Sequence, residues 1–211
     1  MNVRLISITQ AAEGDMRDAE GLIAYCARVS SPHQESLEIE KLLTYLIDNA
    51  HWSPFEMVDM TVEIVTSRAI SPQILRHRSF SFQEFSQRYA AVTKFEPVEL
   101  RMQGNTKQGS ADSIPQHLMS LNDKVNWATN YAEQVYAELL QHGVSRECAR
   151  MVLPLCTQTK LYMKGSVRSW IHYLDVRCES STQKEHRDIA EAIKAIFIEQ
   201  LPTISKACGY V

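Results

Sequence analysis

The feature that most constrains this chain is a strict two-residue alternation of apolar and polar side chains within residues 57–66. The alternation runs Val58, Asp59, Met60, Thr61, Val62, Glu63 and Ile64. Because successive side chains of a β-strand point to opposite faces of its sheet, this pattern predicts a strand with one buried and one solvated face. Half-buried strands are typical of antiparallel sheets.

Weaker patterns on both sides of this strand predict helices and strands that alternate along the chain. Further strands are predicted at residues 2–8, 88–95 and 155–164. Apolar stripes and helix-end signals predict helices at residues 15–29, 36–49, 71–78, 120–142, 145–151, 166–178 and 183–200. Ser36, Ser71 with Pro72, and Thr182 with Glu185 are predicted to open three of them. The expected class is α+β, with an antiparallel sheet packed with several helices.

Length and composition agree with one globular domain. The chain has 211 residues, of which 45% are hydrophobic, which is enough for a sizeable core. We therefore expect a single domain over 1–211, with the polar, aperiodic stretch 102–117 as a surface loop. The formal net charge is -3, which argues against general nucleic-acid binding, since such binding relies on summed positive charge.

The five cysteines are widely spaced, and none forms a CxxC pair or a zinc-ligand pattern with histidines. No metal is expected, and reduced thiols indicate a cytoplasmic protein. The N-terminal apolar stretch is interrupted by Arg4 and is too short for a signal peptide, and no run of residues is long and apolar enough to cross a membrane.

A basic cluster lies within residues 73–89, where Arg76, His77, Arg78 and Arg88 are opposed only by Glu84. The sequence has no glycine-rich phosphate loop, so side chains would have to hold any nucleotide. Guanidinium groups suit phosphates, and Ser86 can face the same side as Arg88 in an extended loop. Two other interpretations remain open: a solvated surface paired with carboxylates, and RNA binding through the aromatic residues between the arginines.

Three further basic positions lie outside this cluster. Arg150 precedes an apolar run, and Arg177 ends the helix that also carries Arg168. On that helix Arg168, His172 and Asp175 share one face by their spacing. A hydrated helix face, with Arg177 favoured at the C-terminus by the helix dipole, explains the same pattern.

The order and spacing of these residues resemble flavin-dependent thymidylate synthases. Residues 76–88 match the family pattern RHR-x7-S-x-R. Segments 51–56, 149–154, 166–177 and 27–30 resemble its H-x-[ST]-P-F-E, AR-x-VLP, late-helix and ARVS segments. Together the matches extend from about residue 20 to 200.

The resemblance implies a site for each ligand. Flavin adenine dinucleotide (FAD) would contact His51, Ser53, Arg76, His77, Arg78, Glu84, Ser166, Val167, Arg168 and His172. Deoxyuridine monophosphate (dUMP) would contact Gln73, Ile74, Leu75, Arg76, Glu84, Phe85, Ser86, Gln87, Arg88, Arg150 and Arg177. Arg177 would be the catalytic residue, activating the pyrimidine by favouring its ionisation. Met57, Ser166 and His172 depart from residues common in the family, which leaves the individual flavin hydrogen bonds undefined.

The implied reaction methylates dUMP to thymidine monophosphate (dTMP), with methylenetetrahydrofolate as carbon donor and NADPH reducing the FAD. The family is homotetrameric with shared active sites, so a homotetramer that binds neither nucleic acid nor a membrane is expected. No cysteine lies inside a matched motif, and Cys178 beside Arg177 is the only sequence-adjacent candidate for a reactive thiol. The alternative function is a non-catalytic nucleotide- or RNA-binding module that uses the basic segment 76–88.

Overall fold

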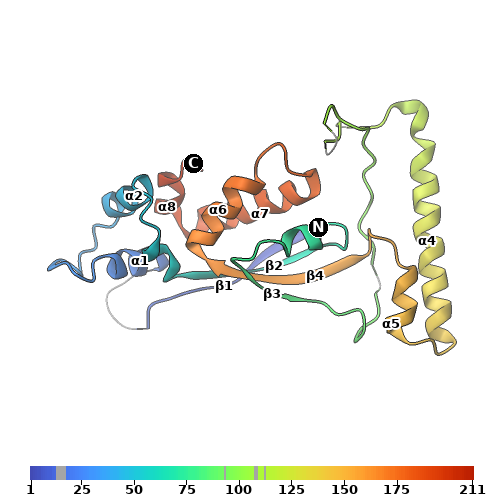
Figure 1. The fold of residues 1–211 in the computed structure, drawn as a ribbon, viewed down its shortest axis with the longest axis horizontal. Coiled ribbons are helices and arrows are strands. Elements are labelled where there is room, and N and C mark those ends of the chain that lie inside the picture. Colours follow the sequence, from blue (N-terminus) through green and yellow to red (C-terminus); the bar gives the residue numbers. More distant parts are fainter. Residues whose placement is uncertain (13–17, 93, 107–108, 112) are drawn as a thin grey trace. The chain divides into compact units, whose positions relative to one another are not determined.

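The alternating segment forms strand β2 (Asp59–Ser67) of a four-stranded sheet in the computed structural model, which describes residues 1–12, 18–92, 94–106, 109–111 and 113–211. The other strands are β1 (Asn2–Ile8), β3 (Ser81–Glu84) and β4 (Gln158–Ser166). Their order is β1-β2-β4-β3, and the sheet is antiparallel (Figure 1). Helices accompany the sheet, so the α+β expectation is confirmed.

The helices follow most of the predicted stripes. They are α1 (Ala19–Ala27), α2 (Glu40–Asp48), α3 (Ser71–Ile74), α4 (Ser120–Gln141), α5 (Arg146–Ala149), α6 (Val167–Arg177), α7 (Lys184–Gln200) and α8 (Pro202–Ala207). Short 3-10 turns are η1 (Ser53–Glu56), η2 (Gln116–Leu118) and η3 (Arg150–Val152). Residues 15–17 of the helix predicted at 15–29 lie outside the described residues, and α8 was not predicted.

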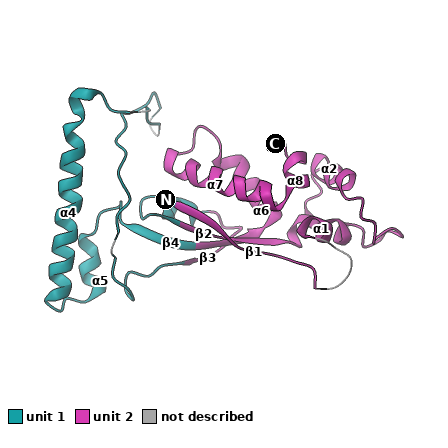
Figure 2. Ribbon diagram, turned by 180° about the vertical axis from the view of Figure 1, so that it is seen from behind, with its two compact units in different colours: residues 1, 65–76, 84–161 teal, residues 2–64, 77–83, 162–211 magenta. Residues whose placement is uncertain are grey.

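The chain divides into two compact units, coloured separately in Figure 2. Unit 1 comprises Met1, Val65–Arg76 and Glu84–Leu161, and unit 2 comprises Asn2–Ile64, His77–Gln83 and Tyr162–Val211. Strands β2, β3 and β4 each contribute residues to both units. The expectation of one domain over 1–211 stays a prediction.

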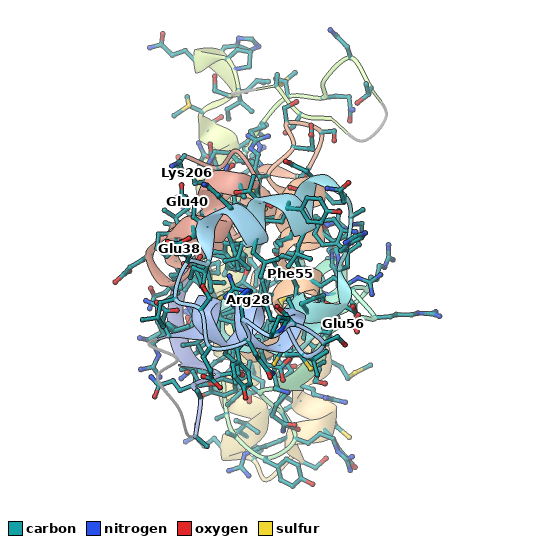
Figure 3. All side chains as sticks on the ribbon, turned by 90° about the vertical axis from the view of Figure 1, so that its left-hand side faces the viewer. Arg28, Glu38, Glu40, Phe55, Glu56 and Lys206 are labelled. Atoms are coloured by element: carbon teal, nitrogen blue, oxygen red, sulfur yellow. The ribbon has the colours of Figure 1, made fainter. Side chains whose placement is uncertain are left out.

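Unit 2 contains a core in which α6 packs on α7, α7 on β1, and α2 on α8. Its largest fully buried side chains include Trp170, Tyr173, Phe55 and Phe197. The indole of Trp170 is satisfied because its Nε1 donates to the Met60 carbonyl at 3.0 Å. Figure 3 shows the α2 and α8 corner, where Lys206 Nζ lies 2.7 Å from Glu40 Oε1.

Unit 1 contains the long helix α4, on which α5 and η3 pack. Among the described residues of α4 only Tyr136 is buried. Trp127 and Tyr131 on this helix are 68% and 55% exposed and stack on each other with ring centroids 5.4 Å apart. Gly143 follows the end of α4 with φ +81°, as its predicted role in ending the helix requires.

Three predicted helix caps are wrong. The helix expected at 36–49 begins at Glu40, and the Ser36 hydroxyl accepts instead from the Glu38 backbone N–H at 3.3 Å. Ser71 is the first residue of α3, not its cap, and α3 ends at Ile74. Thr182 does not cap α7: Gln183 occupies the cap position, and the Thr182 hydroxyl donates to the Val176 carbonyl at 3.3 Å. Serine and threonine hydroxyls also bond to nearby backbone groups outside the helix, so a hydroxyl near a helix start does not by itself identify the cap.

Two strand assignments also need correction. No strand was predicted within residues 79–87, yet Ser81–Glu84 form β3. Residues 88–95 were expected to form a strand, but the described residues there contribute only an isolated bridge between Phe95 and Thr157. The described part of 102–115 holds one bridge, between Gln103 and Ser110. In the described chain, no helix is both long enough and apolar enough to cross a bilayer.

Candidate flavin and nucleotide site

Unit 2 contains a cleft of about 540 Å³, within the size range of small-molecule sites. It is lined by Trp52, Glu56, Ser79, Arg168, Ser169, Ile171, His172 and Asp175. Arg168, His172 and Asp175 therefore share one face of α6, as their spacing predicted. We call this space the α6 cleft.

The first turn of α6 forms part of the cleft wall. Ser166 caps the helix, its Oγ accepting from the Ser169 backbone N–H at 3.3 Å. The Val167 side chain is fully buried and its N–H donates to the Val58 carbonyl at 2.9 Å. Neither the side chain nor the amide of Val167 is thus available to a ligand.

Gly165 has no Cβ atom, and the Phe80 ring occupies the space that a Cβ would take. A Cβ built on Gly165 would lie 2.4 Å from the Phe80 ring, far inside van der Waals contact. Phe80 in turn packs edge-on against Trp170, with ring centroids 4.7 Å apart. The close approach therefore places Phe80, which lies within the basic cluster, directly against α6.

His51 follows a strained helix end. Helix α2 closes with His51 N–H donating to the Leu46 carbonyl at 2.8 Å and Ala50 N–H to the Ile47 carbonyl at 3.0 Å. This is a Schellman ending, in which Ala50 has φ 55° where glycine is preferred. The turn leaves the His51 ring exposed and edge-on to Tyr45.

Charges of both signs line the α6 cleft. Arg168 Nη1 lies 2.5 Å from Glu56 Oε1, and both side chains are about half exposed. His172 is exposed, and Asp175 accepts from the Tyr210 hydroxyl at 2.7 Å. Ser53, the first residue of η1, is exposed.

His77 and Arg177 form the most specific contact of the site. Arg177 Nε donates to His77 Nε2 at 2.8 Å. Because a guanidinium only donates, His77 must be neutral with its proton on Nδ1. Burial, the charge of Arg177 and nearby His172 lower the pKa of His77 to about 4, which agrees with a neutral ring. Arg78 beside it is exposed.

Unit 1 carries the other half of the expected residues. Glu84 Oε1 accepts from Ser71 Oγ at 2.6 Å and Thr159 Oγ1 at 2.9 Å, and lies 3.0 Å from Arg68 Nη1. Three donors therefore converge on one carboxylate oxygen. Glu84 links α3, β3 and β4 within this unit.

The segment after Glu84 is held by its backbone. Phe85 N–H donates to the Lys160 carbonyl at 2.8 Å, and its own carbonyl accepts from Arg68 Nη2 at 2.7 Å. Gln87 is buried, and Ser86 Oγ accepts weakly from the Arg88 N–H at 3.4 Å. We call residues 84–88 the 84–88 segment.

The three expected arginines of unit 1 differ in exposure. Arg88 is 61% exposed and its Nη2 lies 3.1 Å from Glu147 Oε2 on α5. Arg150, which opens η3, is partly buried. Arg76 is exposed.

The three residues before Arg76 differ in accessibility. Gln73 is partly buried, Ile74 is fully buried and Leu75 is 37% exposed. Ile74 is thus a core residue of α3.

Sequence reasoning missed several residues of the cleft wall. Trp52, Glu56, Ser79, Ser169 and Ile171 were not expected at the site. Glu56 had a readable signal, because it is the only acidic residue of the 51–56 segment and Arg168 needs a partner. No set of three or more metal-ligating side chains converges in the described residues.

Cys178 is not poised as a nucleophile. Burial, helped by the nearby Glu191, raises the pKa of its thiol to about 12. A reactive cysteine requires the opposite shift.

Comparisons with known proteins agree with the motifs. The family described as "Thymidylate synthase complementing protein" matches residues 13–203. A "Flavin-dependent thymidylate synthase" of Synechocystis sp. is 53% identical over 98% of this chain and 99% of its own length. A "Probable flavin-dependent thymidylate synthase" of Paramecium bursaria Chlorella virus 1 is 45% identical over the full length of both chains.

A solved structure shares the fold over nearly the whole chain. The UMP/dUMP methylase PolB of Streptomyces cacaoi, crystallised with 5-Br dUMP, is 26% identical, with a TM-score of 0.82. The alignment covers 99% of this chain and 94% of that one. Both the residues matched by the family pattern and the full-length identity lead to one conclusion: this chain belongs to the thymidylate synthase complementing protein family.

Proposed function

We propose that this protein is a flavin-dependent thymidylate synthase that converts dUMP to dTMP. Methylenetetrahydrofolate donates the carbon and NADPH supplies the reducing equivalents, so that tetrahydrofolate and NADP are the other products. The observation that carries the proposal is full-length similarity to relatives bearing that name, joined to the His77–Arg177 contact in the matched motif.

The residues of the α6 cleft fit a flavin. Trp52 and Ile171 offer apolar surface for a flat ring system, and Arg168, His172 and Ser169 offer polar contacts at its rim. We assign flavin contacts to His51, Ser53, His77, Arg78, Ser166, Arg168 and His172, with Arg76 and Glu84 contributing to the same ligand. When bound, the flavin supplies the hydride transfer, and the protein orients it.

Arg177 is assigned the activation of the pyrimidine. Its Nε is occupied by His77, and no other side-chain hydrogen bond of Arg177 occurs among the described residues. The two terminal nitrogens can therefore donate to a ligand. A fixed cation placed at a ring that develops negative charge stabilises the transition state strongly. The high pKa of Cys178 agrees with activation by charge and not by thiolate attack.

The phosphate of dUMP is assigned to Ser86, Arg88 and Arg150. Arg88 offers a fork of donors, and its exposed partner Glu147 is easily displaced because surface ion pairs are weak. The backbone hydrogen bonds of Phe85 and the burial of Gln87 hold the segment that carries Ser86 and Arg88. Ser86→Ala should mainly weaken dUMP binding, and an unchanged affinity would remove Ser86 from the phosphate site.

A homotetramer with shared active sites is part of the proposal. Its support is α4, a helix of 22 residues that buries only Tyr136 among the described residues and exposes the stacked Trp127–Tyr131 pair. Trp127→Glu should break the tetramer, as measured by light scattering, with loss of dTMP formation. Glu133 on the same helix is also exposed and lies about 120° around the axis from Trp127, so it provides the control: Glu133→Gln should leave the assembly intact. A monomeric wild-type protein would exclude shared sites.

The test of the function itself is direct. The purified protein should be yellow, bleach when NADPH is added, and form dTMP from dUMP and methylenetetrahydrofolate in a reaction stimulated by FAD. A colourless protein with salt-dependent RNA affinity would instead support the alternative binding module. A cytoplasmic location stays a prediction from the sequence.

A further inference from the structure

A buried polar pair lies against His77 and has no role in the chemistry assigned so far. Tyr173 on α6 and His186 on α7 are both fully buried. The Tyr173 hydroxyl and His186 Nε2 are 3.1 Å apart. Both residues belong to unit 2, like His77 and Arg177.

This polar pair makes the core less stable than an apolar pair of the same shape would. His186 Nδ1 is buried and has no hydrogen-bond partner within the described part of the chain. An unpaired buried polar atom destabilises a fold, whereas two apolar side chains of similar shape would fill the space without that cost. A polar pair retained at a cost in stability calls for an explanation beyond packing.

The geometry connects the pair to the site. The His77 ring lies 4.9 Å from the Tyr173 ring at 73° and 6.3 Å from the His186 ring at 85°, measured between centroids. Phe80 approaches the third side at 6.3 Å and 88°. Near-perpendicular contacts on three sides fix the plane of the His77 ring, and therefore the direction of its Nε2 toward Arg177.

A neutral Tyr173–His186 pair leaves the protonation state of His77 unchanged, whereas a charged pair would alter it. The titratable groups near His77 are Arg177 and His172 on α6, Tyr173 on the same helix and His186 on α7. A carboxylate in the place of His186 would favour protonation of His77 and would attract Arg177. A neutral Tyr–His pair does neither, so His77 remains an acceptor for Arg177 Nε.

We propose that Tyr173 and His186 are positioning residues. Their buried contact fixes His77, and His77 holds the Arg177 guanidinium in the orientation that it uses on the pyrimidine. This inference rests on the proposed role of Arg177. It assigns no contact with substrate to either residue.

The test separates positioning from stability with two variants. Tyr173→Phe keeps the ring but leaves His186 Nε2 unpaired, so the melting temperature should fall by roughly 2–6 °C. Without its hydroxyl partner the His186 ring can turn away from His77, so the kcat should fall about tenfold while the KM for dUMP stays within about twofold, because misplacing a catalytic group affects turnover. Tyr173→Phe combined with His186→Leu removes both polar partners. The melting temperature should recover, but kcat should stay low.

A merely structural role predicts that kcat recovers together with the melting temperature in the double variant, and that result would overturn the inference. Phe197→Leu on α7 is the matched control, since Phe197 is fully buried and contacts Tyr210 instead of His77. It should lower the melting temperature at unchanged kcat. If the double variant stays unstable, a kcat loss reproduced by Phe197→Leu at equal stability would also overturn the inference.

The pH profile provides a second readout. Freeing the His77 ring lets water reach it and lets Arg177 move away, so the acid limb of kcat should move up by about one pH unit in the double variant. An unmoved limb would contradict the positioning role. Arg177→Ala is measured in parallel: if it retains turnover, the role of Arg177 fails, whereas an inactive Arg177→Ala beside a fully active double variant rejects only this inference.

Discussion

The α6 cleft in unit 2 and the 84–88 segment in unit 1 carry different parts of the proposed chemistry and are built differently. In unit 2, buried rings fix the His77–Arg177 contact, and burial governs the ionisation of His77. In unit 1, backbone hydrogen bonds hold the segment while Arg88 remains exposed on a weak ion pair. The comparison indicates that groups acting on reacting atoms are preorganised, whereas a charged phosphate can recruit mobile arginines on binding.

The strongest test of this contrast is Arg177→Ala. Removing a preorganised cation should lower kcat by about 10²–10³-fold while the bound flavin remains, as measured by dTMP formation and visible absorbance. Arg187→Ala is the matched control, because Arg187 donates to the Ser180 carbonyl at 2.9 Å and does not line the cleft. Turnover in Arg177→Ala equal to that of wild type would reject the catalytic assignment.

The buried histidines of unit 2 should also make the free energy of unfolding fall at acid pH. Burial and neighbouring positive charge lower the pKa of His186 from 6.5 to about 4, and that of His77 similarly. Between these values the unfolded chain binds more protons, so stability is complete above pH 6.5 and is lost as pH falls toward 4. The loss from His186 should reach up to about 3 kcal/mol.

Thermal unfolding at a fixed protein concentration measures this dependence. His186→Leu should flatten the slope between pH 6.5 and 4, whereas His142→Leu, at the exposed end of α4, should not. Equal slopes for wild type and His186→Leu would show that His186 titrates normally.

On the side of unit 1, Arg88→Ala should act on binding and not on turnover. Loss of a charge-assisted phosphate contact should raise the KM for dUMP by about 10–100-fold with a small change in kcat. Arg146→Ala, at an exposed arginine on α5, should leave the KM unchanged. A fall in kcat as large as that of Arg177→Ala would erase the distinction between the two regions.

Glu147→Gln sharpens the same point in the opposite direction. If Glu147 competes with the phosphate for Arg88, its removal should lower the KM for dUMP by about two- to fivefold, the range expected for an exposed ion pair. Steady-state kinetics at low ionic strength give the largest signal. A raised KM would mean that Glu147 orients Arg88 and does not compete for it.

The smallest expected effect concerns the turn before His51. Ala50→Gly relieves a left-handed conformation at φ 55° and should raise the free energy of unfolding by about 0.5–1 kcal/mol. Denaturant unfolding measures the change. Asn49→Gly, at a position with negative φ, is the control and should not stabilise.

Apolar spacing in the sequence predicted which faces of the elements are buried. Features that depend on contacts with distant residues were missed. The alternation around Met60 and the stripe on α6 predicted their buried faces correctly, because burial depends directly on apolar spacing. Glu63 was expected on the solvated face, yet it is 4% exposed because Arg4 and the Tyr162 hydroxyl satisfy its carboxylate. Strand β3 was missed because its four residues include only one apolar side chain, Phe82, and so show no alternation.

The candidate site divides along the same line. The arginines and histidines of the motif could be named from the sequence, and so could the α6 face that carries Arg168 and His172. The position of Trp52 in the cleft wall and the contact between His186 and Tyr173 could not be predicted, because each brings together segments that share no sequence pattern. Wrong caps at Ser36 and Thr182 show the limit of local rules, since each hydroxyl bonds to a backbone group outside the helix that it was expected to open.

Gly165 restricts which amino-acid substitutions this protein can accept. Because even one methyl group there would collide with Phe80, alanine is as unwelcome at this position as any larger side chain. Random mutagenesis aimed at new pyrimidine substrates should therefore recover almost no active clones altered at residue 165, while the exposed neighbour Lys164 accepts many replacements. Any remodelling of the wall beside Phe80 would have to begin with a smaller side chain in place of Phe80 itself.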